Sequence, residues 1–120
     1  MLLLFGSTFP LSLSQTCKYN YLGCFYDTVP YVYSYLQSQP NQFYFVDICI
    51  NFCKFKNTNY SIVYRWYSSM CYCVNTLNFN AVLSNSLCDF ICPGKNGEQY
   101  TCGSSVGNWP YRSTYLNYGS

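Results

Sequence analysis

The sequence predicts a small, disulfide-rich α+β domain in which one helix packs on an antiparallel sheet. Three observations lead to this fold class. The chain has 120 residues, enough for one domain. Nine residues are cysteines, close to the density of short secreted disulfide scaffolds. The apolar pattern changes from a period of two residues to steps of three and four, and then returns to strand-like segments.

Residues 21–26 and 31–36 predict two short strands. The first is rich in aromatic residues and ends at Asp27, Thr28 and Pro30. In the second, tyrosines at positions 31, 33 and 35 alternate with smaller or aliphatic residues, which is the two-residue period of a strand.

Residues 45–55 predict the helix. Apolar side chains recur there at helical steps, at Phe45, Ile48, Cys49, Phe52 and Cys53. Asp47 falls in the expected first turn and Lys54 and Lys56 at the end, which matches the helix dipole.

The second half of the chain predicts more strands. Residues 60–74 are rich in aromatic and β-branched residues, as in a hairpin broken at Ser68 and Ser69. A short helix is predicted from Ala81 toward Cys92, and residues 93–97 form a loop signal. The aromatic tail supplies a last strand.

The composition favours a binding domain over an enzyme. Aromatic residues make up 22% of the chain and charged residues 8%, which excludes intrinsic disorder. The net charge of +2 is too small for a phosphate-binding surface, so no nucleic acid partner is expected. The chain has no histidine, and therefore no Ser-His or Cys-His nucleophile. Asp27, Asp89 and Glu98 are interpreted as structural carboxylates rather than as a glycosidase pair.

Cysteine spacing favours disulfides over a metal site. Zinc ribbons pair two C-x2-C knuckles, whereas here the spacings are Cys49-x3-Cys53, Cys71-x-Cys73 and Cys88-x3-Cys92. Cys49 and Cys53 leave one face of the predicted helix, and Cys71 and Cys73 leave one face of a strand, about 6–7 Å apart. A helix laid across that strand can therefore form two parallel bridges. We expect no metal and no cofactor, and an oxidising compartment.

The first 14 residues predict a signal peptide. Apolar residues are followed by Ser12 and Ser14, the small residues that a signal peptidase reads, although no basic residue precedes them. A buried strand and a fragment of a longer chain are the alternatives. No later segment has the 18 apolar residues of a membrane span, so residues 15–120 are predicted to be one secreted domain.

The residues from about 19 to 103 resemble the WSC domain. Tyr21-Leu-Gly-Cys24-Phe-Tyr-Asp27 is similar to its opening Y-x-G-C-Y-x-D, and the helix with Cys49-Ile-Asn-Phe52-Cys53 follows. Then come Tyr60, Cys71-Tyr-Cys73, Cys88-x3-Cys92-Pro-Gly94 and Glu98 before Cys102-Gly103, so that eight cysteines match in order. Residues 104–120 extend beyond the resemblance as an aromatic tail.

The resemblance implies a fold, a disulfide pattern and a function. The fold would be similar to the PAN/apple class, and the domain would bind carbohydrate without catalysis. The implied pairs are Cys24–Cys88, Cys49–Cys71, Cys53–Cys73 and Cys92–Cys102, with Cys17 left unpaired. The sequence departs from the family pattern at Tyr64, Trp66, Met70 and Val74, so the scaffold is retained more clearly than the ligand surface.

Aromatic residues near these departures are the candidate sugar contacts, because sugar sites combine aromatic faces with a few polar groups. The alternative is that they belong to the core, since a small domain needs large buried side chains. The candidates form two groups: Tyr64, Arg65, Trp66 and Tyr67, and then Trp109 and Tyr111. The expected partner is an extracellular glycan; the alternative is an extracellular protein bound by the same scaffold.

Two further features concern modification and assembly. Asn59-Tyr60-Ser61 is a sequon for N-glycosylation at Asn59. Cys17 is predicted to be a free thiol or to form a bridge to another chain, which would give a disulfide-linked dimer.

Overall fold

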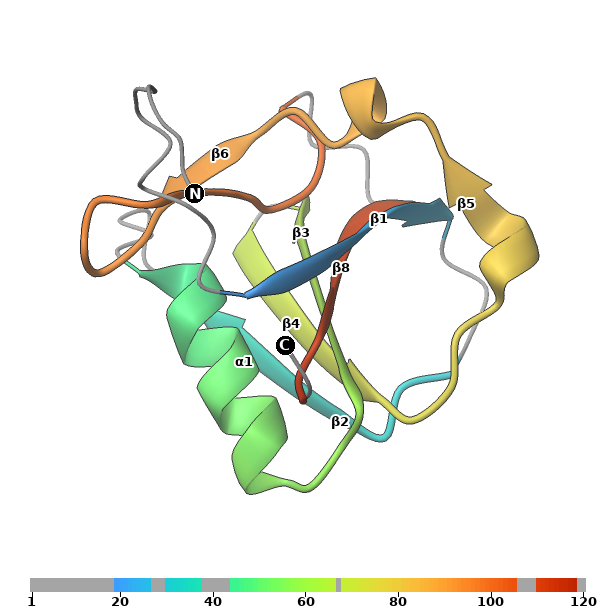
Figure 1. The fold of residues 1–120 in the computed structure, drawn as a ribbon, viewed down its shortest axis with the longest axis vertical. Helices are drawn as coiled ribbons and strands as arrows, with labels where there is room; N and C mark the ends of the chain where they lie inside the picture. Colours follow the sequence, from blue (N-terminus) through green and yellow to red (C-terminus); the bar gives the residue numbers. More distant parts are fainter. Residues whose placement is uncertain (1–18, 27–29, 38–43, 67, 106–109, 119–120) are drawn as a thin grey trace, which may run out of the picture.

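A computed structural model of the chain describes residues 19–26, 30–37, 44–66, 68–105 and 110–118 (Figure 1). One α-helix packs beside an antiparallel sheet, as predicted. The elements in chain order are β1 (Asn20–Tyr26), β2 (Tyr33–Gln37), α1 (Phe45–Phe55), β3 (Tyr60–Trp66), β4 (Ser68–Val74), η1 (Phe79–Ala81), β5 (Val82–Leu83), η2 (Asn85–Leu87), β6 (Ile91–Pro93), β7 (Gln99–Thr101) and β8 (Tyr111–Leu116).

The main sheet has six strands in the order β2-β4-β3-β8-β1-β5, and β6 and β7 form a separate two-stranded sheet. All of the strand pairs are antiparallel. The last strand, β8, lies in the middle of the main sheet between β3 and β1. The C-terminal tail is therefore a structural part of the domain.

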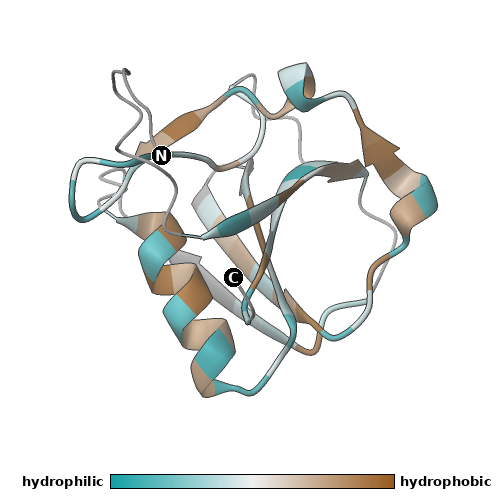
Figure 2. Cartoon of the chain, viewed as in Figure 1, coloured by the Kyte–Doolittle hydropathy of each residue, from teal (hydrophilic) through white to brown (hydrophobic). Residues whose placement is uncertain are grey.

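The helix α1 has the predicted bounds, and most of its apolar residues are buried; hydrophobic and hydrophilic residues alternate along its ribbon (Figure 2). Asp47 lies in the first turn and Lys54 in the last, as the dipole favours. Tyr44 before the helix and Asn57 after it both adopt left-handed backbone, with φ of 57° and 61°. Asn57 tolerates this conformation better than most residues, which explains why the helix ends there.

The core lies between α1 and one face of the sheet. In the register, Val63 pairs with Cys71 on β4 and with Ser113 on β8, and Ser113 pairs with Cys24 on β1. Directly paired residues share a face, so this row points toward α1. A second cluster lies on the opposite face, where Ile62, Tyr64 and Val74 are buried.

Two predicted details of the second half differ from the structure. β3 ends at Trp66 and β4 begins at Ser68, so that Ser68 and Ser69 already belong to β4. No α-helix forms from Ala81 toward Cys92, and the prediction of one is wrong. Instead, β5 pairs with β1, and η1 and η2 are single turns begun by Asn78 and Ser84. These two side chains accept N–H groups two residues onward, a local bond that competes with a longer helix.

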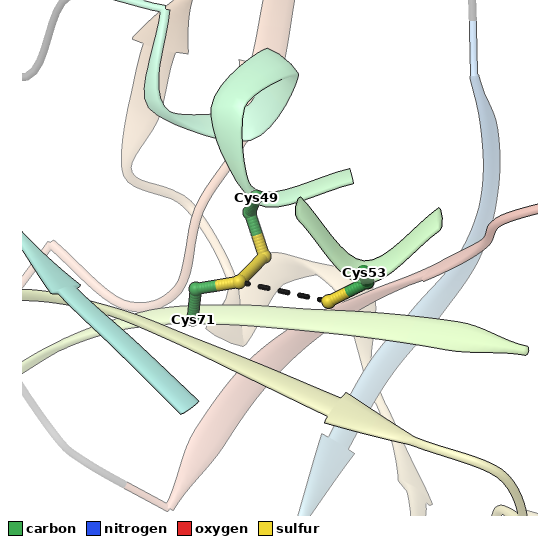
Figure 3. Close-up of side chains that lie close together, drawn as sticks. All are labelled: Cys49, Cys53 and Cys71. Carbon is green, nitrogen blue, oxygen red and sulfur yellow. Dashed lines mark hydrogen bonds between the residues drawn. A yellow bond between two sulfur atoms is a disulfide. The ribbon is translucent and has the colours of Figure 1, made fainter. Parts of the chain in front are cut away.

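Four disulfides join the elements, in the pairs that the resemblance implies. They are Cys24–Cys88, Cys49–Cys71, Cys53–Cys73 and Cys92–Cys102. The second and third run side by side from α1 to β4, with 3.8 Å between the sulfurs of Cys53 and Cys71 (Figure 3). The helical spacing of Cys49 and Cys53 and the strand spacing of Cys71 and Cys73 thus place the two pairs opposite each other, as the sequence predicted.

The β6–β7 hairpin is held against the start of α1 by the buried carboxylate of Asp47. This side chain accepts a hydrogen bond from the Tyr19 hydroxyl at 2.6 Å and one from the backbone N–H of Lys95 at 3.1 Å. Within the hairpin, Glu98 accepts from the backbone N–H of Asn96 at 2.9 Å. Asp47 therefore connects β1, α1 and the hairpin.

Candidate functional site

The most exposed aromatic surface of the described residues lies where the end of α1 meets β2. We call it the Lys56 platform; it consists of Tyr33, Phe52, Phe55 and Lys56. Phe55 is 80% exposed and Tyr33 is 39% exposed, while Phe52 is partly buried. The Lys56 ammonium lies 5.0 Å from the centre of the Tyr33 ring, 5.7 Å from that of Phe52 and 5.8 Å from that of Phe55.

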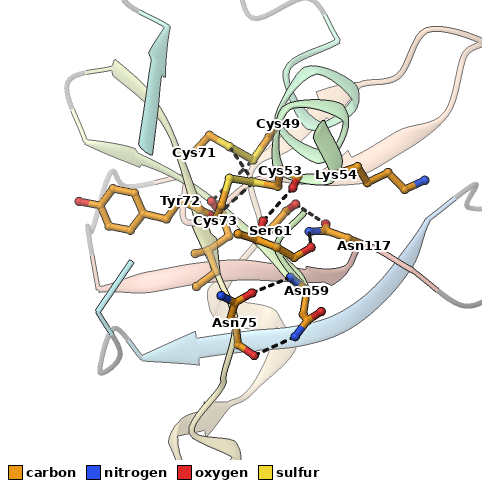
Figure 4. Close-up of a disulfide and its surroundings, with 12 residues drawn as sticks. Cys49, Cys53, Lys54, Asn59, Ser61, Cys71, Tyr72, Cys73, Asn75 and Asn117 are labelled. Carbon is orange, nitrogen blue, oxygen red and sulfur yellow. Dashed lines mark hydrogen bonds between the residues drawn. A yellow bond between two sulfur atoms is a disulfide. The ribbon is translucent and has the colours of Figure 1, made fainter. Parts of the chain in front are cut away.

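The fold brings these side chains together through one disulfide. Tyr33 pairs with Cys73 on β4, and Cys73 is bonded to Cys53 in the last full turn of α1 (Figure 4). Phe55 and Lys56 come two and three residues after Cys53, so the bridge holds the end of the helix beside Tyr33. The platform therefore depends on the contact between helix and sheet, which no local pattern encodes.

A second aromatic group lies on the opposite face of the sheet. The Tyr31 ring, half exposed, stacks on the Tyr72 ring with 4.2 Å between the ring centres. Beneath them, the Arg112 guanidinium lies 3.8 Å from the centre of the Tyr64 ring and 4.9 Å from that of Tyr72. Arg112 is only 3% exposed, so it stabilises this cluster from inside the domain.

Two of the residues that the sequence predicted as sugar contacts, Tyr64 and Tyr111, have described side chains. Tyr64 is 2% exposed and the Arg112 guanidinium covers its ring, so Tyr64 offers no face to a sugar. It belongs to the second hydrophobic cluster, which is the alternative that the sequence left open. Tyr111 is partly buried on β8, paired with Tyr26 on β1.

For two of the other four predicted contacts the structure gives the strand position, and the remaining two lie outside the described residues. Arg65 and Trp66 belong to β3, where they pair with Ser69 and Ser68. Tyr67 and Trp109 lie outside the described residues, as do the predicted signal peptide at 1–14 and Cys17.

A hollow of about 240 Å³ lies between the main sheet and the β6–β7 hairpin. Its lining comes from β1, β6, β7 and β8, namely Tyr21, Ile91, Gln99, Tyr100, Thr101 and Tyr115. Two tyrosine hydroxyls are already engaged: Tyr115 donates to the Thr101 carbonyl oxygen at 2.6 Å, and Tyr21 donates to Asn85 at 3.3 Å. The hollow therefore offers mainly ring faces and aliphatic groups.

Among the described residues, Tyr19, Tyr21 and Asp89 have shifted pKa values with clear causes. Burial, together with the hydrogen bond to Asp47, holds the pKa of Tyr19 well above its usual value. Burial raises the pKa of Tyr21 to about 12. The backbone N–H and hydroxyl of Ser105 donate to Asp89 and lower the pKa of that carboxyl. The shifts keep the two tyrosines neutral and Asp89 charged near pH 7. None of these three pKa values is moved toward 7, as proton transfer at that pH would require.

The sulfurs of Cys49, Cys53 and Cys71 lie within 4.8 Å of one another, as metal ligands would. All three, however, belong to disulfides. A metal is bound by thiolates, so this cluster is a structural crosslink in the oxidised protein.

The sequon residue Asn59 is exposed, between α1 and β3. Its side-chain amide donates to the Asn75 carbonyl oxygen at 3.2 Å, and its backbone N–H donates to the Asn75 side chain at 3.3 Å (Figure 4). Ser61, the third sequon residue, is buried and donates a short hydrogen bond to Asn117.

A family model described as WSC domain matches residues 21–104. The chain belongs to the WSC family. The WSC domain is generally a carbohydrate-binding module and not a catalytic one. The matched segment includes all eight bridged cysteines and ends before β8, so this WSC domain completes its sheet with a strand beyond the family match. Comparisons with curated proteins and with solved structures gave no match.

No helix among the described residues of this WSC domain is long and apolar enough to cross a membrane.

The sequence interpretation missed Phe55 and Lys56 as surface residues. Phe55 follows the helical apolar positions 45, 48, 49, 52 and 53 but falls outside their stripe, at two residues after Cys53. A large apolar residue off the apolar stripe of an amphipathic helix is a usable signal of surface function.

Proposed function

We propose that this WSC domain is an extracellular, non-catalytic module that binds glycans by stacking sugar rings on the Lys56 platform. The observation that carries the proposal is the 80% exposure of Phe55 next to the 39% exposed ring of Tyr33. Single exposed apolar residues are ordinary, but two exposed rings grouped around one cation form a defined surface.

The chemistry of sugars fits such a surface. A pyranose ring has faces rich in C–H groups, which pack on aromatic rings, while its hydroxyls stay in contact with water or with polar groups at the rim. The Phe55 ring supplies the open face, and Tyr33 adds a hydroxyl to its ring. The Cys53–Cys73 bridge joins α1, which carries Phe55, to β4, and Tyr33 pairs with Cys73 on β4, so little is lost in ordering the two rings when a sugar binds.

The test compares Phe55→Ala with Phe79→Ala. Phe79 is also strongly exposed, at 62%, but lies on η1, where its ring contacts Phe25. The oxidised protein would be titrated with soluble oligosaccharides chosen from a glycan array. We expect Phe55→Ala to weaken binding about fivefold or more, and Phe79→Ala to leave it within about twofold, since aromatic contacts contribute about 0.5–1.5 kcal/mol.

Binding that survives Phe55→Ala unchanged would show that the platform is not the sugar site. The proposal would then move to the sugar contacts predicted from the sequence, which are Arg65, Trp66, Tyr67, Trp109 and Tyr111. Trp66→Ala and Tyr111→Phe test these contacts. If the correctly oxidised wild-type protein binds no glycan on the array, the proposed function is wrong.

A second candidate function is the recognition of another extracellular protein, and the hollow beside the β6–β7 hairpin favours it. Protein interfaces are anchored by large side chains that fill pockets, and this lining has ring faces and aliphatic groups to offer. Ile91, 49% exposed at its rim, is the position to alter. Loss of a protein partner in Ile91→Asp, with glycan binding retained, would assign the two functions to different surfaces.

We extend the proposal to secretion, processing, glycosylation and fold. Four disulfide bridges fit a secreted protein. We propose that residues 1–14 are removed, that Asn59 is glycosylated and that the scaffold is similar to the PAN/apple class. Cys17 would then be a free thiol or a link between two chains. Intact mass of the secreted protein tests the bridges, the processing and the glycan, and a dimer band that reducing agent and Cys17→Ser both abolish tests the link.

A further inference from the structure

We infer that the Lys56 platform selects acidic glycans, whose sugar rings carry carboxylate groups. This inference rests on the proposed function and adds the class of sugar that the site prefers. It is carried by the position of the Lys56 ammonium among the rings on which a sugar would stack.

The ammonium is fixed beside the stacking surface. It lies within 6 Å of the centres of three rings, those of Tyr33, Phe52 and Phe55. Cation–π attraction keeps it there and the rings exclude part of its water, which strengthens its attraction to an anion compared with a freely solvated lysine. A sugar lying on Phe55 would bring its ring substituents toward this charge.

The acidic side chains of the described region are engaged elsewhere. Asp47 is buried at the opposite end of α1, bound to Tyr19 and to the Lys95 backbone. Glu98 is buried in the hairpin, and Asp89 accepts hydrogen bonds from Ser105. Within the described residues, the contacts of the Lys56 ammonium are with the rings of the platform, which leaves its charge facing a sugar stacked on them.

Among the described residues, the two neighbours of Phe55 in the chain are both lysines. Lys54 precedes Phe55 and Lys56 follows it, so the exposed ring is flanked in the chain by two cations. Their positive charge outweighs the partial negative charge of the helix C-terminus, which amounts to about half an elementary charge. A carboxylate on a stacked sugar therefore meets a favourable potential, whereas a neutral sugar gains only the ring contact.

The experiment uses one sugar chain in two charge states. Oligogalacturonate and its methyl ester have the same rings, but the ester has no charge. The oxidised full-length protein would be titrated with each by calorimetry in about 0.01 M salt, where the screening length is about 30 Å. We expect the acid to bind about fivefold more tightly than the ester, the effect of one partly exposed ion pair.

Lys56→Gln should remove this preference, so that the acid and the ester bind with equal affinity. Lys95→Gln is the matched control, because its side chain is exposed on the hairpin far along the chain from the platform. It should keep the preference. Raising the salt to about 1 M, where the screening length is about 3 Å, should also remove the preference.

Equal affinity for acid and ester would overturn the inference, and so would an equal loss in Lys56→Gln and Lys95→Gln, which would indicate unspecific attraction. In either case, binding of neutral glycans that depends on Phe55 would leave the proposed function intact. Binding of no glycan at all would overturn both.

Discussion

The Asp47 carboxylate gives the sharpest stability prediction, because it connects three parts of the domain. It is 4% exposed and accepts hydrogen bonds from the Tyr19 hydroxyl on the β1 side and from the Lys95 backbone in the hairpin. Hydrogen bonds to a charged group contribute about 1.5–3 kcal/mol each. Asp47→Ala removes both acceptors and should lower the free energy of unfolding by about 3 kcal/mol.

A double-mutant cycle isolates the Tyr19 bond. Tyr19→Phe keeps the ring, which packs against Tyr100 with 5.2 Å between ring centres, and removes only the hydroxyl. We expect it to cost about 1.5 kcal/mol, and nearly nothing when Asp47 is already alanine, so that the two changes couple by about 1.5 kcal/mol. Tyr21→Phe is the control: its hydroxyl bonds the neutral Asn85 at 3.3 Å and should cost about 0.5 kcal/mol.

The assay is urea unfolding of the oxidised protein near pH 7, followed by tyrosine fluorescence. Additive effects of Tyr19→Phe and Asp47→Ala would refute the reasoning, because they would show that the two side chains do not act through a shared bond. So would a loss in Tyr21→Phe as large as that in Tyr19→Phe.

The hydrogen bond between Tyr19 and Asp47 should also make the stability depend on pH. The pKa of Tyr19 is raised in the folded state, so above the ordinary value of 10.0 the unfolded chain releases this proton before the folded one does. The stability that it contributes is complete below pH 10 and falls as the pH rises beyond it. Tyr19→Phe should make this alkaline decline shallower in brief unfolding measurements; an unchanged decline would contradict the assignment.

Two further predictions concern the hairpin and the bridges. At Gly94 a Cβ would clash with the Glu98 carboxylate and lie 2.7 Å from the Tyr100 ring, so Gly94→Ala should cost about 2–3 kcal/mol in urea unfolding. Gly97→Ala meets no neighbour and should cost only about 1 kcal/mol, from its φ of 87°. Serine at both positions of Cys24–Cys88, separated by 64 residues, should cost about 4 kcal/mol, against about 3 kcal/mol for the ten-residue bridge within the hairpin, measured in the same way. A larger loss of stability in Gly97→Ala than in Gly94→Ala would refute the first argument. A larger loss on removing Cys92–Cys102 than on removing Cys24–Cys88 would refute the second.

Local patterns predicted the elements that local physics controls. The helix at 45–55 follows from its apolar spacing and charges, and the first strand from its aromatic run. The predicted helix after Ala81 failed because Val82 and Leu83 extend as β5 and pair with β1, and Ser84 then begins only a single turn by accepting the Ser86 N–H. The aromatic pattern left open whether Tyr64 is buried, because such a pattern does not show which face of a sheet another layer covers.

The sequence by itself determined the family, the helix at 45–55 and the eight cysteines of the frame, because spacing and periodicity are local properties of the chain. Only the tertiary structure decided that the tail enters the sheet as β8 between β3 and β1, and that Lys56 lies among Tyr33, Phe52 and Phe55. Those contacts join residues distant along the chain, and they form because burying the helix against the sheet removes apolar surface from water wherever in the sequence it originates.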